Sequence, residues 1–149
     1  MADELFEADA PGPEAGPTDP EDAARDAFAE LVWRSVDALR DALGEPYAAR
    51  LGAVAFLVED DPPPEKRPPG GTLLGLYEGV PGKVYQADLA IEPARITIYR
   101  RPHEMIFRDP AEQARAVDST VRHEVAHCFG TDEAGIRAIE AERRGLPHR

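Results

Sequence analysis

Two long segments with helical periodicity, each with recognisable start and stop residues, constrain the fold of this chain more than any other feature of its sequence. The first segment starts at Asp19 and Pro20, which suit the N-cap and the first turn of a helix, and it stops at Gly44. Apolar residues recur along it at helical spacing: Ala24, Phe28, Leu31, Val32, Leu39 and Leu43. This helix should therefore place one apolar stripe on a core.

The second segment starts at Asp109, which suits the N-cap, and Pro110 follows it in the first turn. It carries a similar apolar stripe and stops at Gly130. A last, shorter helix is expected from about residue 132 to residue 143.

Short strands are predicted between the two long helices. Residues 53–58 form an apolar run typical of a buried strand, and the proline-rich stretch 59–71 that follows is predicted to be an exposed loop. Residues 72–82 are expected to form a short strand and a turn, 83–90 are a weak strand candidate, and 94–101 alternate as a strand does. The order α-β-β-β-α-α favours an α+β fold.

Length and composition predict one domain preceded by a short arm. The 149 residues, 42% of them apolar, are enough for a single core. Residues 1–18 combine Pro, Gly, Ala and acidic residues with almost no large apolar side chains, so we expect a disordered acidic arm. Residues 19–145 should form the single domain.

Charge and hydropathy argue against two classes of partner. The formal charge is −12, and residues 1–22 contain eight acidic residues and no Lys or Arg. Removing these eight from the 29 acidic residues leaves 21 against 17 Lys and Arg, so no basic surface for nucleic acid is expected. No apolar run approaches the roughly 20 residues that cross a bilayer, and the first residues do not resemble a secretory signal. With Cys128 as the single cysteine, we expect a soluble protein in the reducing cytoplasm, without membrane partners.

Two histidines, His123 and His127, stand four residues apart in the second predicted helix, and Glu124 follows the first. Positions i and i+4 lie on one face of a helix, so both imidazoles can reach a single ion. Glu124 lies about 100° further round the helix, where its carboxylate can approach a water bound to that ion. This HExxH pattern predicts a Zn²⁺ site, although two such histidines can also be ordinary surface or core residues.

A third protein ligand is needed for a zinc ion that two histidines hold. Gly130 can adopt a left-handed backbone conformation, which would end the helix and turn the chain back. Glu133 is the preferred third ligand, and Asp132 is the next candidate. Glu140 and Glu142, on the last predicted helix, are more remote candidates.

The run "HEVAHCFGTDE" resembles the HExxHxxGxx(D/E) signature of a small bacterial family of zincin-like metallopeptidases, formerly catalogued as a domain of unknown function. Other segments are similar to landmarks of that family in the same order: "LVED" before the proline-rich loop, "LLGLYEGVP", "ARITIYRRPHEM" and "VRHEVAH". The resemblance extends over residues 24–143.

The resemblance implies a compact zincin-like fold, in which a small mixed sheet packs on the helix that bears the motif. It implies that His123, His127 and Glu133 bind zinc. It also implies that Glu124 is the catalytic general base in the hydrolysis of a peptide bond, with a peptide or protein as substrate. Cys128 departs from the family pattern, because many relatives have histidine at this position. Its thiol either binds metal or packs in the core. Packing in the core is favoured, because Cys128 does not lie on the face of the helix that carries the two histidines.

Two alternatives to a zinc peptidase stay open from the sequence. One is a non-catalytic zincin-like module that binds a peptide or a partner protein and keeps the metal for stability, and the other is a scaffold without metal. Residues 94–101 are predicted to be an edge strand, which either pairs with an extended peptide or is kept soluble by Arg100 and Arg101. His103 is expected in a loop or near a helix, without metal.

Packing roles rather than catalytic roles are expected for Tyr77, Tyr85 and Tyr99.

Overall fold

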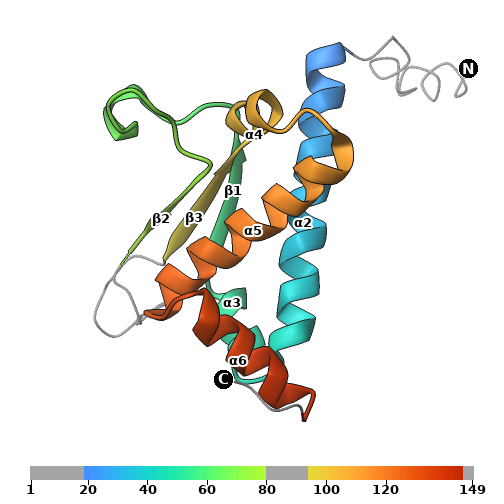
Figure 1. The fold of residues 1–149 in the computed structure, drawn as a ribbon, viewed down its shortest axis with the longest axis vertical. Helices are drawn as coiled ribbons and strands as arrows, with labels where there is room; N and C mark the ends of the chain where they lie inside the picture. Colours follow the sequence, from blue (N-terminus) through green and yellow to red (C-terminus); the bar gives the residue numbers. More distant parts are fainter. Residues whose placement is uncertain (1–18, 80–93, 146–149) are drawn as a thin grey trace, which may run out of the picture.

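The computed structural model describes residues 19–79 and 94–145, which form five α-helices and three β-strands (Figure 1). In chain order these are α2 (Pro20–Leu43), α3 (Tyr47–Gly52), β1 (Ala55–Glu59), β2 (Gly75–Glu78), β3 (Arg95–Tyr99), α4 (Arg100–Ile106), α5 (Pro110–Phe129) and α6 (Glu133–Arg143), with a 3₁₀ turn, η2 (Pro64–Lys66), in the proline-rich loop. The predicted arm 1–18, the strand candidate 83–90 and Tyr85 lie outside the described residues. Within the described ranges, no helix is both long enough and apolar enough to cross a bilayer.

The two long helices begin and end where the sequence predicts. The side chain of Asp19 accepts a hydrogen bond from the amide of Glu21, and α2 ends at Gly44, whose φ is 66°. The side chain of Asp109 accepts from two amides in the first turn of α5. These side chains satisfy amide groups that the helix itself leaves unpaired, which explains why the boundaries were predictable. The short helices α3 and α4 were not predicted.

The three strands form one mixed sheet in the order β1-β3-β2. β3 pairs with β1 in parallel and with β2 in antiparallel orientation. The predicted α+β fold with a small mixed sheet is therefore confirmed. The prediction that residues 94–101 form an edge strand is wrong, because β3 lies in the middle and both of its sides are paired. Arg100 and Arg101 belong to α4, so they do not keep an exposed sheet edge soluble as predicted.

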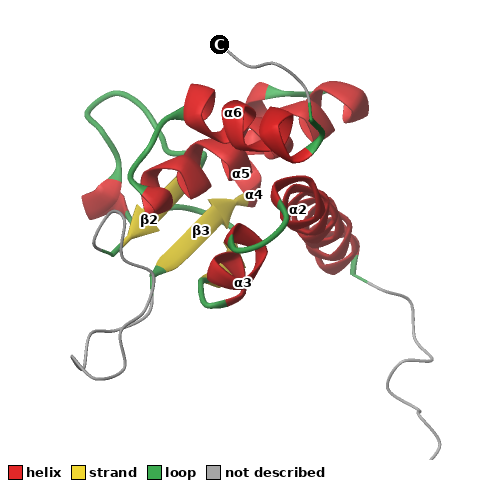
Figure 2. Ribbon diagram, turned by 90° about the horizontal axis from the view of Figure 1, so that it is seen from below, coloured by secondary structure: helices red, strands yellow, loops and turns green. Residues whose placement is uncertain are grey.

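Helix α5 is the element that links the sheet to the other helices. It contacts β2 and β3 and packs against α2 and α6. In Figure 2, α5 and α6 lie on one side of the strands and α3 lies on the other. The core between these layers consists mainly of aliphatic side chains that are almost completely buried: Phe28, Val32, Leu39, Leu43, Leu51, Ile96, Ile98, Val117, Val121, Val125 and Ile136.

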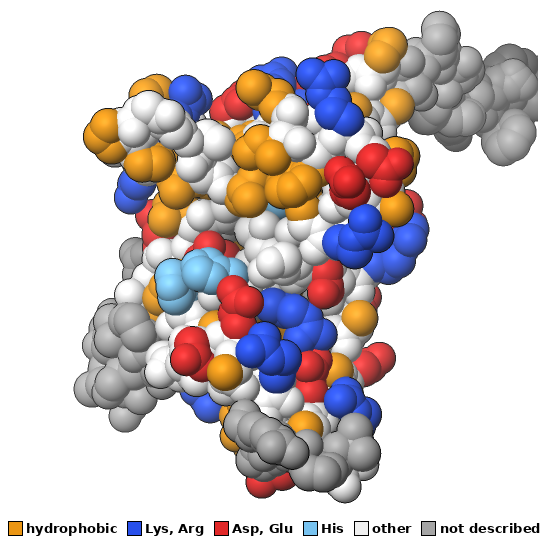
Figure 3. Space-filling view, viewed as in Figure 1, with side chains coloured by type: hydrophobic (Ala, Val, Ile, Leu, Met, Phe, Trp, Pro, Cys, Tyr) orange, Lys and Arg blue, Asp and Glu red, His pale blue; other side chains and the backbone are white. Residues whose placement is uncertain are grey.

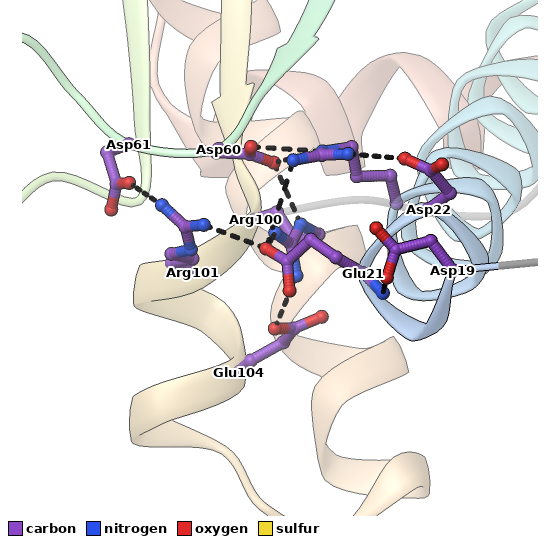
Figure 4. A network of polar contacts seen from close by, with 9 residues as sticks. Asp19, Glu21, Asp22, Asp60, Asp61, Arg100, Arg101 and Glu104 are labelled. Carbon is purple, nitrogen blue, oxygen red and sulfur yellow. Dashed lines mark hydrogen bonds and ion pairs between the residues drawn. The ribbon is translucent and has the colours of Figure 1, made fainter.

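A cluster of charged residues ties the start of α2 to the sheet (Figure 4). At its centre is Arg100, whose side chain is 2% exposed. Its Nε donates to Asp60 at 2.9 Å, its Nη1 donates to Glu104 at 2.9 Å, and its Nη2 donates to Glu21. The hydrogen bond from Arg100 holds the pKa of Asp60 below its usual range. Three carboxylates from three segments thus neutralise one buried guanidinium, as a buried charge requires.

His103 is a second buried polar group, and it lies within α4 rather than in a loop. It is 0% exposed. Its Nδ1 donates to the carbonyl oxygen of Tyr99 at 2.7 Å, and its Nε2 lies 3.0 Å from the hydroxyl of Thr120 on α5. Burial lowers the pKa of this imidazole, which favours the neutral form. His103 therefore joins α4 to α5 and has a structural role.

Gly75, the first residue of β2, lets the strand approach α5 closely. A Cβ atom at this position would lie 2.7 Å from the methyl group of Thr120 and 3.2 Å from Cγ of Glu124. A carbon atom does not fit at 2.7 Å, so any larger residue must push β2 away from α5. The absence of a side chain here sets the distance between the sheet edge and Glu124.

Gly75→Ala should lower the free energy of unfolding by about 1–3 kcal/mol, the usual cost of overpacking. Urea denaturation measures this change. Gly52→Ala is the matched control, because a Cβ atom at Gly52 meets nothing within 4 Å. Equal stability of both variants and the wild type would contradict the close approach of β2.

Arg100→Met should lower the free energy of unfolding by about 2–3 kcal/mol, because it removes the buried centre of the cluster and leaves Glu104 without a cation, although Asp60 keeps Arg25 and Glu21 keeps Arg101. Arg34→Met is the control: Arg34 and its partner Glu30 are 71% and 69% exposed. Its loss should change the stability by no more than about 0.5 kcal/mol. Similar effects of the two substitutions in thermal or urea unfolding would show that the Arg100 cluster does not anchor α2.

Candidate metal centre

The two histidines of the motif lie side by side on the exposed face of α5. The ring centroids of His123 and His127 are 4.5 Å apart, as expected for positions one helical turn apart. Both side chains are about half exposed, at 50% and 54%. In Figure 3 the histidines form a patch on the surface, with acidic side chains beside it.

The turn after α5 brings α6 back to these histidines. Gly130 has φ 74° and ψ 29°, the left-handed conformation that the sequence predicts. Its amide and that of Thr131 donate to carbonyl groups in the last turn of α5, at 3.0 and 2.8 Å. Helix α6 then begins at Glu133, whose Oε2 lies 3.1 Å from Nδ1 of His123. The structure therefore places Glu133 beside His123, which in turn lies next to His127.

The other acidic candidates are engaged elsewhere or lie further along α6. Asp132 is the N-cap of α6, and its carboxylate accepts from the amide of Gly135 at 2.9 Å. Glu140 is buried, and its two oxygens accept from Arg122 at 3.0 and 2.7 Å. Glu142 lies near the C-terminal end of α6. Among these acidic residues, Glu133 is therefore the one whose carboxylate is placed at the histidines.

Glu124 occupies a different environment from its two histidine neighbours. It is only 6% exposed, beneath the start of β2, and its Oε1 lies 3.6 Å from Nδ1 of His127. Burial raises the pKa of its carboxyl group, while the two histidines and the backbone amide of Tyr77 act in the opposite direction. A raised pKa makes the carboxylate a better proton acceptor, which suits a group that takes up a proton and gives it back during a reaction.

Two imidazoles and a carboxylate suit zinc in their chemistry, and a fourth position would remain for water. Within the described residues, however, no three His, Cys, Asp or Glu side chains are already grouped around one point. Nδ1 of His123 is instead hydrogen-bonded to Glu133. All three predicted ligands are about half exposed, so these side chains can reorient without repacking the core. The donor set fits zinc, and the ligand set stays a prediction.

Cys128, by contrast, is part of the core. It is 0% exposed, and burial raises the pKa of its thiol to about 11. A metal-binding cysteine must give up its proton, and this environment opposes that. Of the two roles that the sequence allowed for Cys128, core packing is the one observed.

Comparison with known proteins adds an independent observation. The family model described as zincin-like metallopeptidase matches residues 51–143, which is more than half of the chain and includes β1 to α6. The chain belongs to the zincin-like metallopeptidase family. No curated protein matches it.

Two features of this zincin-like centre were missed by the sequence analysis. One is β2 as the strand beside Glu124; the glycine within "LLGLY" was its signal, because a glycine inside a strand indicates a close backbone approach. The other is the pair of Arg122 and Glu140, which fixes α6 to α5 beside His123. No local pattern predicts that pair, since its members are 18 residues apart.

We expect one zinc ion per chain, with an affinity that depends on the three predicted ligands His123, His127 and Glu133. The loss of a residue that only hydrogen-bonds a metal ligand typically lowers metal affinity by roughly 10–100-fold. The loss of a ligand itself should lower zinc affinity by more than this in each of three variants: His123→Ala, His127→Ala and Glu133→Gln. Isothermal titration with zinc after chelation measures this loss. Glu142→Gln is the control for Glu133→Gln and should retain wild-type affinity. If Asp132→Asn weakened binding and Glu133→Gln did not, the assignment of the third ligand would be wrong.

Proposed function

We propose that this protein is a zinc-dependent peptidase in which Glu124 is the general base. The observation that carries the proposal is the placement of Glu124: a buried carboxyl group with a raised pKa lies between two exposed imidazoles and the start of β2. Membership of the zincin-like metallopeptidase family supports the same reaction class.

His123, His127 and Glu133 would hold the ion. When bound, zinc lowers the pKa of water toward 7 and polarises a carbonyl group. Glu124 takes the proton from the attacking water and then delivers it to the nitrogen of the leaving amine. Because Glu124 is buried, its carboxylate is held in one place and is only weakly screened by solvent, which favours directed proton transfer.

β2 supplies an edge with which an extended peptide can pair. The amide of Tyr99 donates to the carbonyl of Leu74 at 3.0 Å, so Leu74 and Leu76 turn their backbone groups toward β3. The backbone groups of residues 73, 75 and 77 therefore point to the other side, where no strand among the described residues pairs with them. Residues 94–101 were one candidate for pairing with a peptide; because β3 is paired on both sides, β2 is the candidate edge instead.

A second candidate function is a non-catalytic module that binds a peptide at the same edge. The observation that favours it is the hydrogen bond between Nδ1 of His123 and Oε2 of Glu133, which pairs one nitrogen of the imidazole with one oxygen of the carboxylate. In that case zinc would add stability or would be dispensable. The edge of β2 would still bind a peptide, so cleavage separates the two functions.

Glu124→Gln should reduce peptide cleavage by at least about 100-fold, the typical contribution of a general base. Zinc content should stay at the wild-type level, because Glu124 is not one of the proposed ligands. Mass spectrometry of a digested peptide mixture and metal analysis of the same sample measure both quantities. Glu142→Gln, an exposed change of the same kind on α6, should leave cleavage unchanged.

Cleavage that survives in the Glu124→Gln protein would mean that another group is the base or that a contaminant is responsible. If the zinc-loaded wild type cleaves no peptide, the binding-module function is favoured instead.

A further inference from the structure

A groove lies between β1 and α2, at the opposite edge of the sheet from β2. Its volume is about 420 Å³, which is within the usual range of binding sites. It is lined mainly by one face of α2 and by the end of β1: Arg25, Asp26, Ala29, Val58, Glu59 and Asp60. The ion pair between Arg25 and Asp60, with 3.0 Å between Nε and Oδ2, closes one end of the groove. No residue of this groove belongs to the candidate metal centre.

β1 has an unpaired outer side among the described residues. The amide of Ala55 donates to the carbonyl of Ala94 at 2.9 Å, so residues 55, 57 and 59 turn their backbone groups toward β3. The backbone groups of Phe56 and Val58 therefore point outward, and no described strand pairs with them. These groups are free to pair with an added strand, the binding mode called β-augmentation.

Trp33 extends the wall that α2 contributes to the groove. Arg25, Ala29 and Trp33 follow one another at intervals of four residues, so they lie on one face of the helix. Ala29 and Val58 both line the groove, and α2 and β1 run in opposite directions (Figure 1). Four residues of helix and two residues of strand both span about 6–7 Å, which places Trp33 level with Phe56. Trp33 is 42% exposed, and tryptophan is a residue type enriched at protein interfaces.

The charges that remain free at the groove are acidic. The two arginines beside it, Arg25 and Arg100, are already bonded to carboxylates. Asp26 and Glu59, by contrast, are exposed, and neither forms an ion pair with any residue in the described ranges. The groove therefore offers negative charge to a partner, which favours a basic one.

We propose that this groove binds an extended basic segment of a partner protein, which adds to the edge of β1 as a further strand. The side chains of such a segment point alternately to the two faces of the sheet. Those on the side of α2 are apolar and cover Ala29, Val58 and Trp33, which removes apolar surface from water. Those on the other side are basic and lie beside Glu59, whose side chain points away from that of Val58. The inference is independent of the proposed reaction.

The chain itself is a poor source for this segment. Residues 1–18 contain five acidic residues and no Lys or Arg, so the free carboxylates of the groove repel them. A second copy carries the same formal charge of −12, and like charges oppose a contact between two β1 edges. The charges therefore favour a different polypeptide as the partner.

The probe for the test is a short peptide of alternating lysine and leucine, added to the full chain. Trp33 is the only tryptophan of the chain, so its fluorescence reports directly on the groove. Binding should shift the Trp33 emission to shorter wavelength, because the leucine side chains exclude water from the indole. Fluorescence polarisation of the labelled peptide gives the dissociation constant.

Two control peptides test the two parts of the proposal. Glutamate in place of every lysine keeps the apolar side and should abolish binding, because the charges then repel. Proline at the central positions removes amide groups that strand pairing needs, and it should weaken binding by at least about tenfold. Either control peptide binding as tightly as the probe would overturn the inference.

The double variant Asp26→Lys, Glu59→Lys reverses the free charges of the groove and should weaken binding by at least about tenfold. Its matched control is Asp41→Lys, Glu142→Lys, which changes the net charge equally at two exposed positions. Asp41 is about 22 Å along α2 from Asp26, beyond the roughly 8 Å over which salt screens charges. The control should bind the probe as the wild type does. Equal affinity of both double variants would contradict the proposed site.

The edge of β2 and a second copy of the chain are the competing explanations. Binding at β2 would leave the Trp33 emission unchanged and would not respond to the Asp26→Lys, Glu59→Lys double variant. That result would overturn the inference. A wild-type dimer that Trp33→Lys separates, measured by sedimentation, would assign the groove to a second copy and would equally overturn it.

Discussion

The left-handed turn at Gly130 is the constraint on which the candidate centre depends. It ends α5 soon after His127 and leaves only residues 130–132 before α6 begins. Because the turn reverses the chain so sharply, the first residue of α6, Glu133, comes back to His123. In a residue with a Cβ atom, this backbone conformation is unfavourable by roughly 1–2 kcal/mol. The backbone conformation of Gly130 therefore allows a carboxylate of α6 to lie near the two histidines of α5.

Helix α5 gives its residues three different environments. Its valines enter the core, its histidines face solvent, and Glu124 lies between them beneath β2. The periodicity of the helix produces this separation, because Glu124 is one position and about 100° away from His123. The absence of a side chain at Gly75 lets β2 cover Glu124, and Arg122 fixes α6 through Glu140. The same few turns of α5 thus provide the valines of the core, the two candidate zinc-binding histidines and the carboxylate of Glu124.

Features governed by local interactions could be predicted from the sequence, and those governed by pairing across the chain could not. Asp19, Asp109 and Gly130 act within a few residues of themselves, so the helix boundaries followed from them. The order of strands depends on contacts between distant segments, and 94–101 was therefore misplaced at the edge. Arg100 was expected at a sheet edge, yet it is buried because its three carboxylate partners come from distant or unforeseen elements.

X-ray absorption at the zinc edge of the metal-loaded protein tests the central claim most directly. If His123, His127 and Glu133 share one ion, the first shell contains only nitrogen and oxygen at about 2.0–2.2 Å, with the outer-shell signal of two imidazoles. That signal should drop to one imidazole in His127→Ala. A sulfur neighbour at about 2.3 Å, or zinc without any imidazole signal, would contradict the account.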